Sequence, residues 1–297
     1  MCADRRAGTG AALVVVATPI GNLDDLSPRA RAALAGADLV ACEDTRRTGR
    51  LLELTGIGRR PLLRVDDHTE GSSAAELVRR LTAGEQVVLV TDAGTPAIAD
   101  PGQRMVRAVL DAGLDVTVVP GPSAPLAALV ASGLPTARFV FEGFLPRRGQ
   151  ARRRRLAEVA AESRTTVLLE SPHRLAATLA DLSQACGPDR QVAVARELTK
   201  LHEEVVRGPV GAVASEIGET ARGEVVVVVG PAPPDTSATD EVISEELRRL
   251  LAAGSSRRDA VVEVAAGLGV ARRRVYGLAL DVDEVHDVDE GSPNWRP

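Results

Sequence analysis

Four segments of the chain combine glycine, proline and small polar residues in a way that suits close contact with a small ligand. They are residues 18–23, 91–102, 120–124 and 142–146. Glycine lets a backbone approach a ligand closely, and proline fixes the shape of a loop. Backbone amides and carbonyls in such loops hold a neutral or zwitterionic ligand without a phosphate cradle. Any one segment is typical of an ordinary turn, but four at one edge of a sheet indicate a binding site.

The usual nucleotide fingerprints are absent from the sequence. No Gly-x-Gly-x-x-Gly segment follows a predicted strand, and no Gly-Lys-Ser/Thr phosphate loop exists. Gly267-Leu-Gly269 lacks both the third glycine and the preceding strand. These absences disfavour dinucleotide-dependent dehydrogenases and phosphate-loop enzymes.

The basic residues mark further candidates. Lys200 is the only lysine among 36 basic residues, and lysine, unlike arginine, can lose its proton when partly buried. Glu197 lies three residues earlier and can shift the pKa of Lys200. Six arginines fall within nine positions, and a second group lies near the C-terminal end; such runs either meet phosphate or form a solvated face. The first group is Arg147, Arg148, Arg152, Arg153, Arg154 and Arg155, and the second is Arg257, Arg258, Arg272, Arg273 and Arg274.

The composition excludes several classes of protein. A net charge of −5 over 297 residues excludes a generally basic nucleic-acid-binding surface, so any polyanion needs a local patch. Aromatic residues make up only 2%, which excludes binding of single strands mainly by base stacking. Three scattered cysteines predict no disulfide framework and no Cys-pair metal site, and they favour a reducing cytosol. Neither a membrane helix nor a signal peptide is predicted.

The first 132 residues alternate strand and helix patterns. Apolar runs predict strands at residues 13–17, 38–42, 62–65, 86–91 and 115–119, and helices at 28–37, from near Ser72 and from near Asp100. This order favours an open, largely parallel sheet, whose ligands bind beyond the carboxyl ends of the strands.

A second α/β unit, a linker and a helical module are predicted after it. Expected strands are residues 138–142, 165–169, 191–195, 204–207 and 224–229, and expected helices are 151–161, 174–185 and 210–219. Five consecutive valines in the last strand indicate burial on both faces. Helices are expected at 241–253, 257–266 and 271–280. The predicted domains are residues 11–134, 135–231 and 240–283, followed by an acidic, disordered tail at 284–297.

The ordered motifs resemble one known family. The four loops, together with Ala41-Cys-Glu-Asp-Thr-Arg46, Leu169-Glu-Ser-Pro-His-Arg-Leu175 and Ala195-Arg-Glu-Leu-Thr-Lys200, resemble the ribosomal RNA small subunit methyltransferases of the tetrapyrrole methylase superfamily over roughly residues 11–283. The resemblance implies two α/β domains with S-adenosylmethionine in the cleft between them, and a homodimer without a metal. It also implies methylation of the ribose 2′-OH of a cytidine in the decoding region of 16S rRNA, within the small ribosomal subunit.

The resemblance also implies roles for individual residues. Lys200, Glu197 and Arg46 are the candidate catalytic residues; Lys200 would orient the hydroxyl as a cation, accept its proton as a neutral amine, or serve only as a phosphate clamp or in a structural ion pair. The first arginine group, from Arg147 to Arg155, is assigned to RNA. The residues assigned to the cofactor are Pro19, Asp92, Gly94, Thr95, Pro96, Ile98, Ser123, Ala124, Leu169, Glu170, Gly223 and Val225.

Two other functions fit the same sequence. One is methylation of a tetrapyrrole or another small molecule, which the arginine groups and the helical module disfavour. The other is a noncatalytic RNA-binding factor in ribosome assembly that retains the fold.

Overall fold

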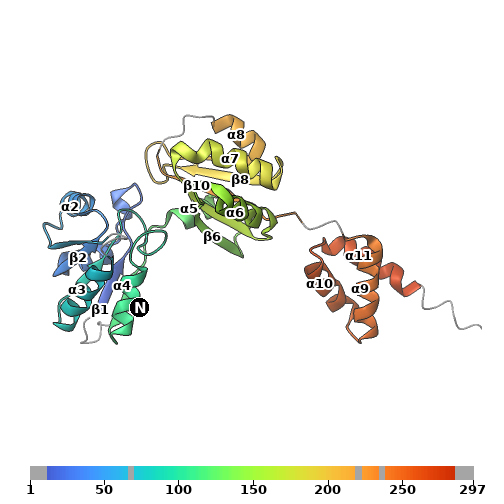
Figure 1. The fold of residues 1–297 in the computed structure, drawn as a ribbon, viewed down its shortest axis with the longest axis horizontal. Helices are drawn as coiled ribbons and strands as arrows, with labels where there is room; N and C mark the ends of the chain where they lie inside the picture. Colours follow the sequence, from blue (N-terminus) through green and yellow to red (C-terminus); the bar gives the residue numbers. More distant parts are fainter. Residues whose placement is uncertain (1–11, 66–69, 218–222, 234–237, 285–297) are drawn as a thin grey trace, which may run out of the picture. The chain divides into compact units, whose positions relative to one another are not determined.

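The computed structural model describes residues 12–65, 70–217, 223–233 and 238–284. The chain divides into two compact units, residues 1–231 and 232–297. The first unit contains two β-sheets with their helices, and the second contains three helices (Figure 1).

The first sheet has five parallel strands in the order β3-β2-β4-β1-β5. Because all five are parallel, their carboxyl ends meet at one edge, as the sequence predicts. Their bounds are β1 Ala12–Val16, β2 Leu39–Cys42, β3 Leu62–Arg64, β4 Val87–Leu89 and β5 Asp115–Val119.

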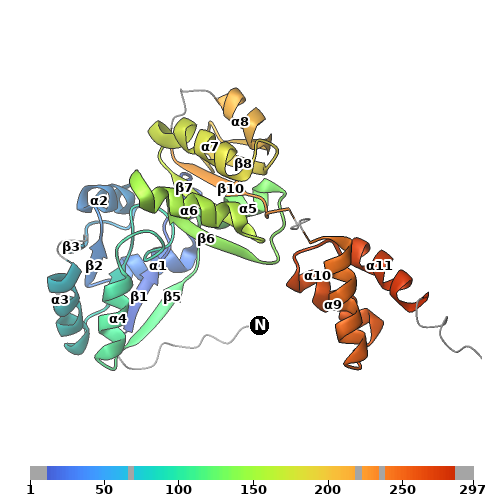
Figure 2. The ribbon, with the colours of Figure 1, turned by 45° about the vertical axis from the view of Figure 1, so that its right-hand side comes forward.

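Helices cover both faces of this sheet (Figure 2). α3 (Glu70–Thr82) and α4 (Gln103–Asp111) pack on one face through Leu77, Leu81 and Met105. α1 (Pro28–Gly36) and α2 (Thr45–Leu54) pack on the other through Leu34 and Leu52. The core is aliphatic, as the composition requires.

Local capping explains where the helices on the second face begin. Ser27 caps α1 by accepting a hydrogen bond from the amide of Ala30 at 3.1 Å, with Pro28 at the first helical position, as predicted. The carboxylate of Asp44 caps α2 by accepting from the amides of Arg46 and Arg47. The sequence analysis did not predict α2, because its first turn is a run of charged residues that breaks the apolar periodicity.

The second sheet is mixed, in the order β6-β7-β10-β8-β9. β6 and β7 are parallel, and the other neighbouring pairs are antiparallel. β10 lies in the middle with all five valines buried, which confirms the prediction. The bounds are β6 Phe139–Phe144, β7 Thr165–Glu170, β8 Gln191–Arg196, β9 Glu204–Pro209 and β10 Val225–Val229.

The helices on this sheet do not all come from the same part of the chain. α6 (Gly149–Ala161), α7 (Pro172–Cys186) and α8 (Val210–Ile217) cover one face. The other face is covered by α5 (Ala124–Ser132), which directly follows the last strand of the first sheet. The sequence pattern does not predict α5, because Pro125 in its first turn, with Pro120 and Pro122 just before it, is typical of a loop. Ile20 of the first loop packs into the same cluster, so both α5 and this loop contact the second sheet.

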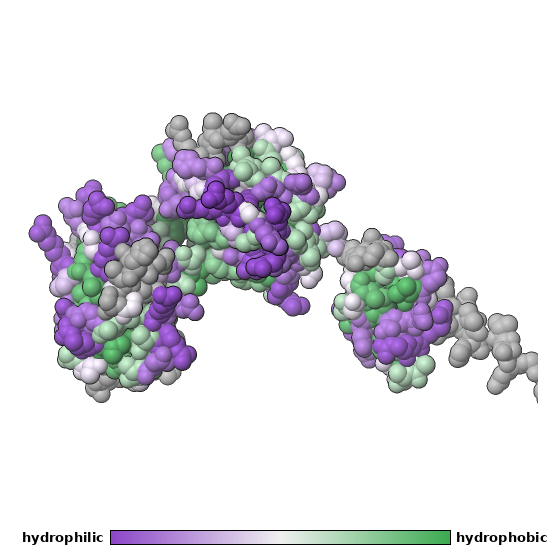
Figure 3. All heavy atoms as spheres, in the orientation of Figure 1, coloured by the Kyte–Doolittle hydropathy of each residue, from purple (hydrophilic) through white to green (hydrophobic). Residues whose placement is uncertain are grey.

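The second unit is a three-helix bundle. α9 (Asp240–Ala252), α10 (Arg257–Gly267) and α11 (Arg272–Glu284) pack around Ile243, Leu247, Val264 and Val275. On the face drawn in Figure 3, an apolar area of this unit is bordered by hydrophilic residues. α11 continues through residues 281–284, beyond the end of the helix predicted at 271–280; residues 285–297 lie outside the described residues. Among the helices that the structure describes, none has the length and apolar character needed to cross a bilayer.

Candidate functional site

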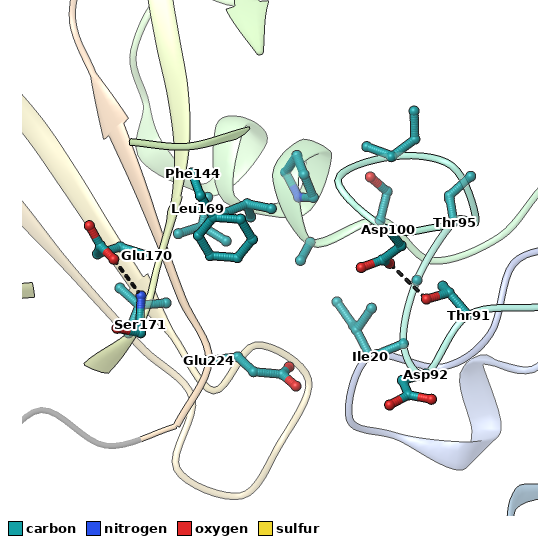
Figure 4. Close-up of a pocket in the computed structure, with 18 of the residues that line it drawn as sticks. Ile20, Thr91, Asp92, Thr95, Asp100, Phe144, Leu169, Glu170, Ser171 and Glu224 are labelled. Carbon is teal, nitrogen blue, oxygen red and sulfur yellow. Dashed lines mark hydrogen bonds between the residues drawn. The ribbon is translucent and has the colours of Figure 1, made fainter. Parts of the chain in front are cut away.

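A pocket of about 400 Å³ lies between the loops at the carboxyl edge of the first sheet and the ends of β6, β7 and β10 (Figure 4). This volume is within the range of about 300–1,000 Å³ that is typical of small-molecule sites. Its walls are mostly small or apolar, with a few carboxylates. The first sheet contributes Ile20, Glu43, Arg47, residues 91–95, Ile98, Asp100 and residues 123–125. The second contributes Phe144, residues 169–172 and residues 223–226.

Three loops on the first-sheet side are fixed to one another by hydrogen bonds. Thr18 and Gly94 exchange backbone hydrogen bonds, with N···O distances of 2.8 and 3.1 Å. The hydroxyl of Thr18 donates to the carbonyl of Thr91 at 3.2 Å, and that of Thr95 donates to the carbonyl of Pro122 at 3.2 Å. The loops therefore form one preorganised wall.

A further contact joins this wall to residues 197–203, the loop between β8 and β9. The amide of Asn22 donates to the hydroxyl of Thr199 at 3.1 Å. A Cβ on Gly21 would lie 2.5 Å from Cγ of Lys200 and 2.8 Å from the carbonyl oxygen of Leu198, so only glycine allows this approach.

Backbone strain is concentrated beside the pocket. In the described ranges, the non-glycine residues with positive φ are Ala97, Ala99, Glu197 and Thr199, with φ from 50° to 67°. Each costs of order 1–2 kcal/mol, which the surrounding packing has to offset. Strained residues of this kind mark loops whose shape matters for a ligand.

The pocket is electronegative. Five carboxylates line it, together with one cation, Arg47, which lies 3.4 Å from Asp92; the carboxylates are Glu43, Asp92, Asp100, Glu170 and Glu224. Burial raises the pKa of Asp92, although a hydrogen bond from the amide of Asp44 and the charge of Arg47 oppose this. The pocket therefore favours a positively charged ligand.

Among the carboxyls that line the pocket, Asp100 has the most strongly shifted pKa. Burial, with the nearby charge of Glu43, raises the pKa of Asp100 from 3.8 to about 6, against the opposing hydrogen bond from Thr91. The hydroxyl of Thr91 lies 2.8 Å from Asp100 and 3.1 Å from Glu43, and its single proton can be donated to only one of them.

We expect Asp100→Asn to stabilise the protein, and more at pH 8 than at pH 5. The folded state holds the proton of Asp100 more tightly than the unfolded chain does. That stabilisation is fully present below about pH 4 and is lost as the pH rises through about 6. Asparagine removes the cost of the buried charge, so the Tm at pH 8 should rise by about 3 °C. Thermal unfolding without ligand at both pH values measures this, with the exposed Asp111→Asn as control; an equal change at both pH values contradicts it.

Most of the residues that the sequence assigns to a cofactor do line this pocket. These are Asp92, Gly94, Thr95, Ile98, Ser123, Ala124, Leu169, Glu170, Gly223 and Val225. Pro19 and Pro96 are not among the lining residues. One premise was wrong: the segment 142–146 begins inside β6 of the second sheet, so the four loops do not share one sheet edge. Phe144 reaches the pocket from the opposite wall instead.

The three candidate catalytic residues do not line the pocket. Lys200 lies behind its rim, with its ammonium 2.9 Å from Glu197 and 3.6 Å from Glu224, which does line it. Burial lowers the pKa of Lys200, but the hydrogen bond that its ammonium donates to Glu197 and the charge of Glu224 outweigh this effect, so the net shift is upward. Lys200 is therefore a cation at neutral pH, and the neutral-amine role does not fit. The side chain of Arg46 is 92% exposed and lies outside the pocket, whereas the next residue, Arg47, lines it.

The first arginine group divides into buried and exposed members. Arg152 is only 8% exposed; its guanidinium donates to Asp181, Thr178 and the carbonyl of Pro146, which removes it from the predicted RNA surface. Arg155 pairs with Glu142 and Glu158, and Arg154 lies 3.7 Å from Glu158. Arg147, Arg148 and Arg153 are exposed.

Fold and pocket together are those of an α/β protein whose ligand site lies between two sheets. The profile of the Tetrapyrrole (Corrin/Porphyrin) Methylases matches residues 12–214. Diphthine synthase, at 16% identity, has a TM-score of 0.58 over 74% of this chain and 90% of that one. Uroporphyrin-III C-methyltransferase from Thermus thermophilus, solved with S-adenyl homocysteine, has 23% identity and a TM-score of 0.53 over 74% and 97%. The chain belongs to the tetrapyrrole methylase family, and it is a methyltransferase.

Curated relatives are similar over nearly the whole chain. The ribosomal RNA small subunit methyltransferase I of Mycobacterium tuberculosis (strain H37Rv) is 47% identical over 272 residues, which are 90% of this chain and 94% of that protein. The protein of the same name from Synechocystis is 44% identical over 274 residues, covering 91% and 98%. The similarity to these relatives therefore extends beyond residues 12–214, the part of the chain that the family profile matches.

Proposed function

We propose that this chain is an S-adenosylmethionine-dependent methyltransferase that acts on the ribose 2′-OH of a cytidine in the decoding region of 16S rRNA. The observation that carries the proposal is the pocket, whose walls come from both sheets and whose charge is negative. The names of relatives at 40–47% identity support the rRNA substrate. An rRNA substrate in the small ribosomal subunit also implies a cytosolic enzyme.

The donor set of the pocket fits this cofactor. Ala93, Ala124, Val225 and Val226 offer flat, apolar walls for a nucleoside, and the carboxylates complement a cation. When bound, S-adenosylmethionine supplies a methyl group on a positively charged sulfonium. The chain itself binds and orients the two reactants, excludes water and stabilises charge, and for a weak hydroxyl nucleophile much of the rate comes from that positioning. Among the described residues, no group of three or more His, Cys, Asp or Glu side chains is arranged as a metal site.

Lys200 contributes as a fixed cation behind the rim, held by Glu197 and close to Glu224. We expect Lys200→Arg, which keeps the charge, to retain kcat within about tenfold, and Lys200→Met to lower kcat by about a hundredfold, as when one electrostatic contact is removed. Single-turnover rates over a range of pH measure both variants. If Lys200→Arg falls as far as Lys200→Met, lysine is needed for its own chemistry and the assignment as a cation is wrong.

The exposed arginines around α6 form the proposed RNA-contacting patch. Replacing Arg147, Arg148 and Arg153 with Gln should weaken binding of small-subunit rRNA and reduce the slope of log K against log salt by about 0.7–0.9 per lost phosphate contact. Filter binding at several salt concentrations measures the slope. Arg107→Gln on α4 is the control, and Arg152 is left intact because it is structural. An unaltered slope would show that the patch is only solvated.

The proposed homodimer has apolar surface available for it. Leu126 and Val130 lie one turn apart on α5, and both are exposed. Exposed residues of this kind suit contact with a second copy of the chain, and analytical ultracentrifugation measures the mass directly.

Tritium transfer from labelled S-adenosylmethionine tests the proposed activity. The acceptors are 30S subunits and free 16S rRNA from a strain that lacks the endogenous enzyme, and primer extension at limiting nucleotide concentration then locates any ribose methylation. Label in a cytidine ribose of the decoding region is the expected result. Label only in a tetrapyrrole or other small molecule, or RNA binding without any transfer, would instead support one of the two other functions.

A further inference from the structure

The helical unit contains a groove that the proposed reaction does not use. It has a volume of about 550 Å³ and lies between α10 and α11. Residues at positions i, i+1 and i+4 line it from each helix, so each helix turns one face toward it. The lining residues are Arg257, Arg258, Val261, Val262, Arg272, Arg273 and Tyr276, four of which are cationic and none acidic.

Tyr276 is unusual for its position. It is 55% exposed at the groove, although the chain has only one tyrosine and the bundle core is built without it. Val262, 37% exposed, adds an apolar contact on α10. An exposed ring beside arginines is the arrangement on which a nucleobase stacks while guanidinium groups bind the neighbouring phosphates.

Two charged residues beside the groove, Arg274 and Asp259, contact residues outside its lining, so the charge of the groove itself is positive. Arg274 is absent from the lining; its guanidinium donates to Asp240 at 2.7 Å and to the carbonyl of Ala238 at 2.8 Å, joining α11 to the start of α9. On α10, the carboxylate of Asp259 accepts a hydrogen bond from Ser256 at 2.7 Å as part of the helix cap. The run 272–274 is therefore divided into two groove residues and one structural residue.

We propose that this groove binds a segment of single-stranded RNA, with phosphates on Arg258, Arg272 and Arg273 and one base on Tyr276. The proposal rests on the proposed function, since an rRNA substrate supplies the strand. An acidic peptide has no base to stack on the tyrosine, and a membrane surface needs a broader apolar face than Val262 and Tyr276 provide. The groove is then a second contact with RNA, separate from the pocket.

The first test measures affinity with the full-length protein and a fluorescein-labelled, single-stranded 12-nucleotide RNA of mixed sequence. We expect the double variant Arg258→Gln with Arg272→Gln to raise Kd about tenfold at 0.15 M salt. The slope of log K against log salt should fall by about 1.4, because each of the two lost contacts on a single strand contributes about 0.7. Tyr276→Ala should raise Kd at least fivefold and Tyr276→Phe should not, because stacking needs only the ring. The matched control, Arg29→Gln with Arg248→Gln, removes the same charge from exposed sites on α1 and α9. Groove and control variants with equal Kd and slope would overturn the proposal.

A second test locates the base. RNA containing 5-iodouridine crosslinks on irradiation to an aromatic ring that stacks on the base, and mass spectrometry of the digest identifies the residue. A crosslink at Tyr276 supports the groove, and crosslinks confined to Phe144 or another aromatic residue overturn it. Variants that bind naked RNA normally but lose affinity for whole 30S subunits, or for anionic vesicles, would assign the groove to a protein or lipid partner and also overturn it.

Failure of this proposal can be distinguished from failure of the proposed function. If wild-type protein transfers tritium to rRNA but the groove variants bind RNA as well as the control does, only the groove proposal fails. If the groove variants weaken RNA binding but wild-type protein methylates no RNA, the proposed function fails and the groove stands. Calorimetric affinity for S-adenosylmethionine should be unchanged in every groove variant.

Discussion

Ile98→Arg and Ser123→Trp should each raise the Kd for S-adenosylmethionine by at least a hundredfold while leaving the fold intact. Both side chains line the pocket from loops that hydrogen bonds hold in place, so a bulky or cationic replacement occupies ligand space and cannot move aside. Arginine at position 98 also adds positive charge where the cofactor carries its own. Neither change removes a core contact: Ile98 is half-exposed, and Ser123 starts α5 without a side-chain cap hydrogen bond. A hundredfold loss corresponds to about 2.7 kcal/mol.

Isothermal titration calorimetry measures these affinities, and thermal unfolding confirms that each variant is folded. Leu110→Arg is the matched control, because Leu110 is also an exposed aliphatic residue but lies on α4 away from the pocket. Folded variants that bind the cofactor as tightly as wild type would show that the ligand is held elsewhere.

Gly223→Ala should abolish measurable cofactor binding, whereas Gly84→Ala should not affect it. Both glycines have positive φ, +82° and +88°, so alanine costs about 1–2 kcal/mol of stability at either position. They differ in their surroundings: a Cβ at position 84 meets nothing within 4 Å, while one at position 223 overlaps the carboxylate of Glu197. Displaced Glu197 would also lose its ion pair with Lys200, so the rim next to Glu224 would move.

Urea unfolding and calorimetry on the two variants separate backbone strain from the clash. Similar free energies of unfolding, with cofactor binding lost only in Gly223→Ala, are the expected pattern. Normal cofactor affinity in Gly223→Ala would mean that the rim formed by residues 223–226 does not contact the ligand.

Sequence patterns predict this fold well where a single local signal decides the structure. The five valines of β10 have no polar alternative and lie buried in the middle of their sheet. Ser27 followed by Pro28 marks the start of α1, which needs only local hydrogen bonding. The prediction fails where the first turn of a helix does not look helical. Arg46 and Arg47 interrupt the apolar pattern at the start of α2, and Pro125 at the start of α5 is typical of a loop.

For the site residues, too, local sequence patterns predict only part of the structure. Glycine-rich loops are visible in the sequence because their backbone shape is local, and they do line the pocket. Whether Arg46 or Arg47 faces inward depends on the rotation of α2, which its cap at Asp44 fixes. The roles of Arg152 and Lys200 depend on partners that are distant in sequence, Asp181 and Glu224, which no local pattern reveals.

α5 follows the last strand of the first sheet but packs on the second, and this has a consequence for unfolding. Ala128 and Leu129 of α5 are buried against β8 and β10, so a polypeptide ending at residue 134 would keep the first sheet but expose an apolar helix with nothing to cover it. We therefore expect the two halves of residues 12–231 not to fold independently of each other. Heat or denaturant should melt them in one cooperative transition, and an attempt to express either half alone should yield aggregates rather than a working half-site.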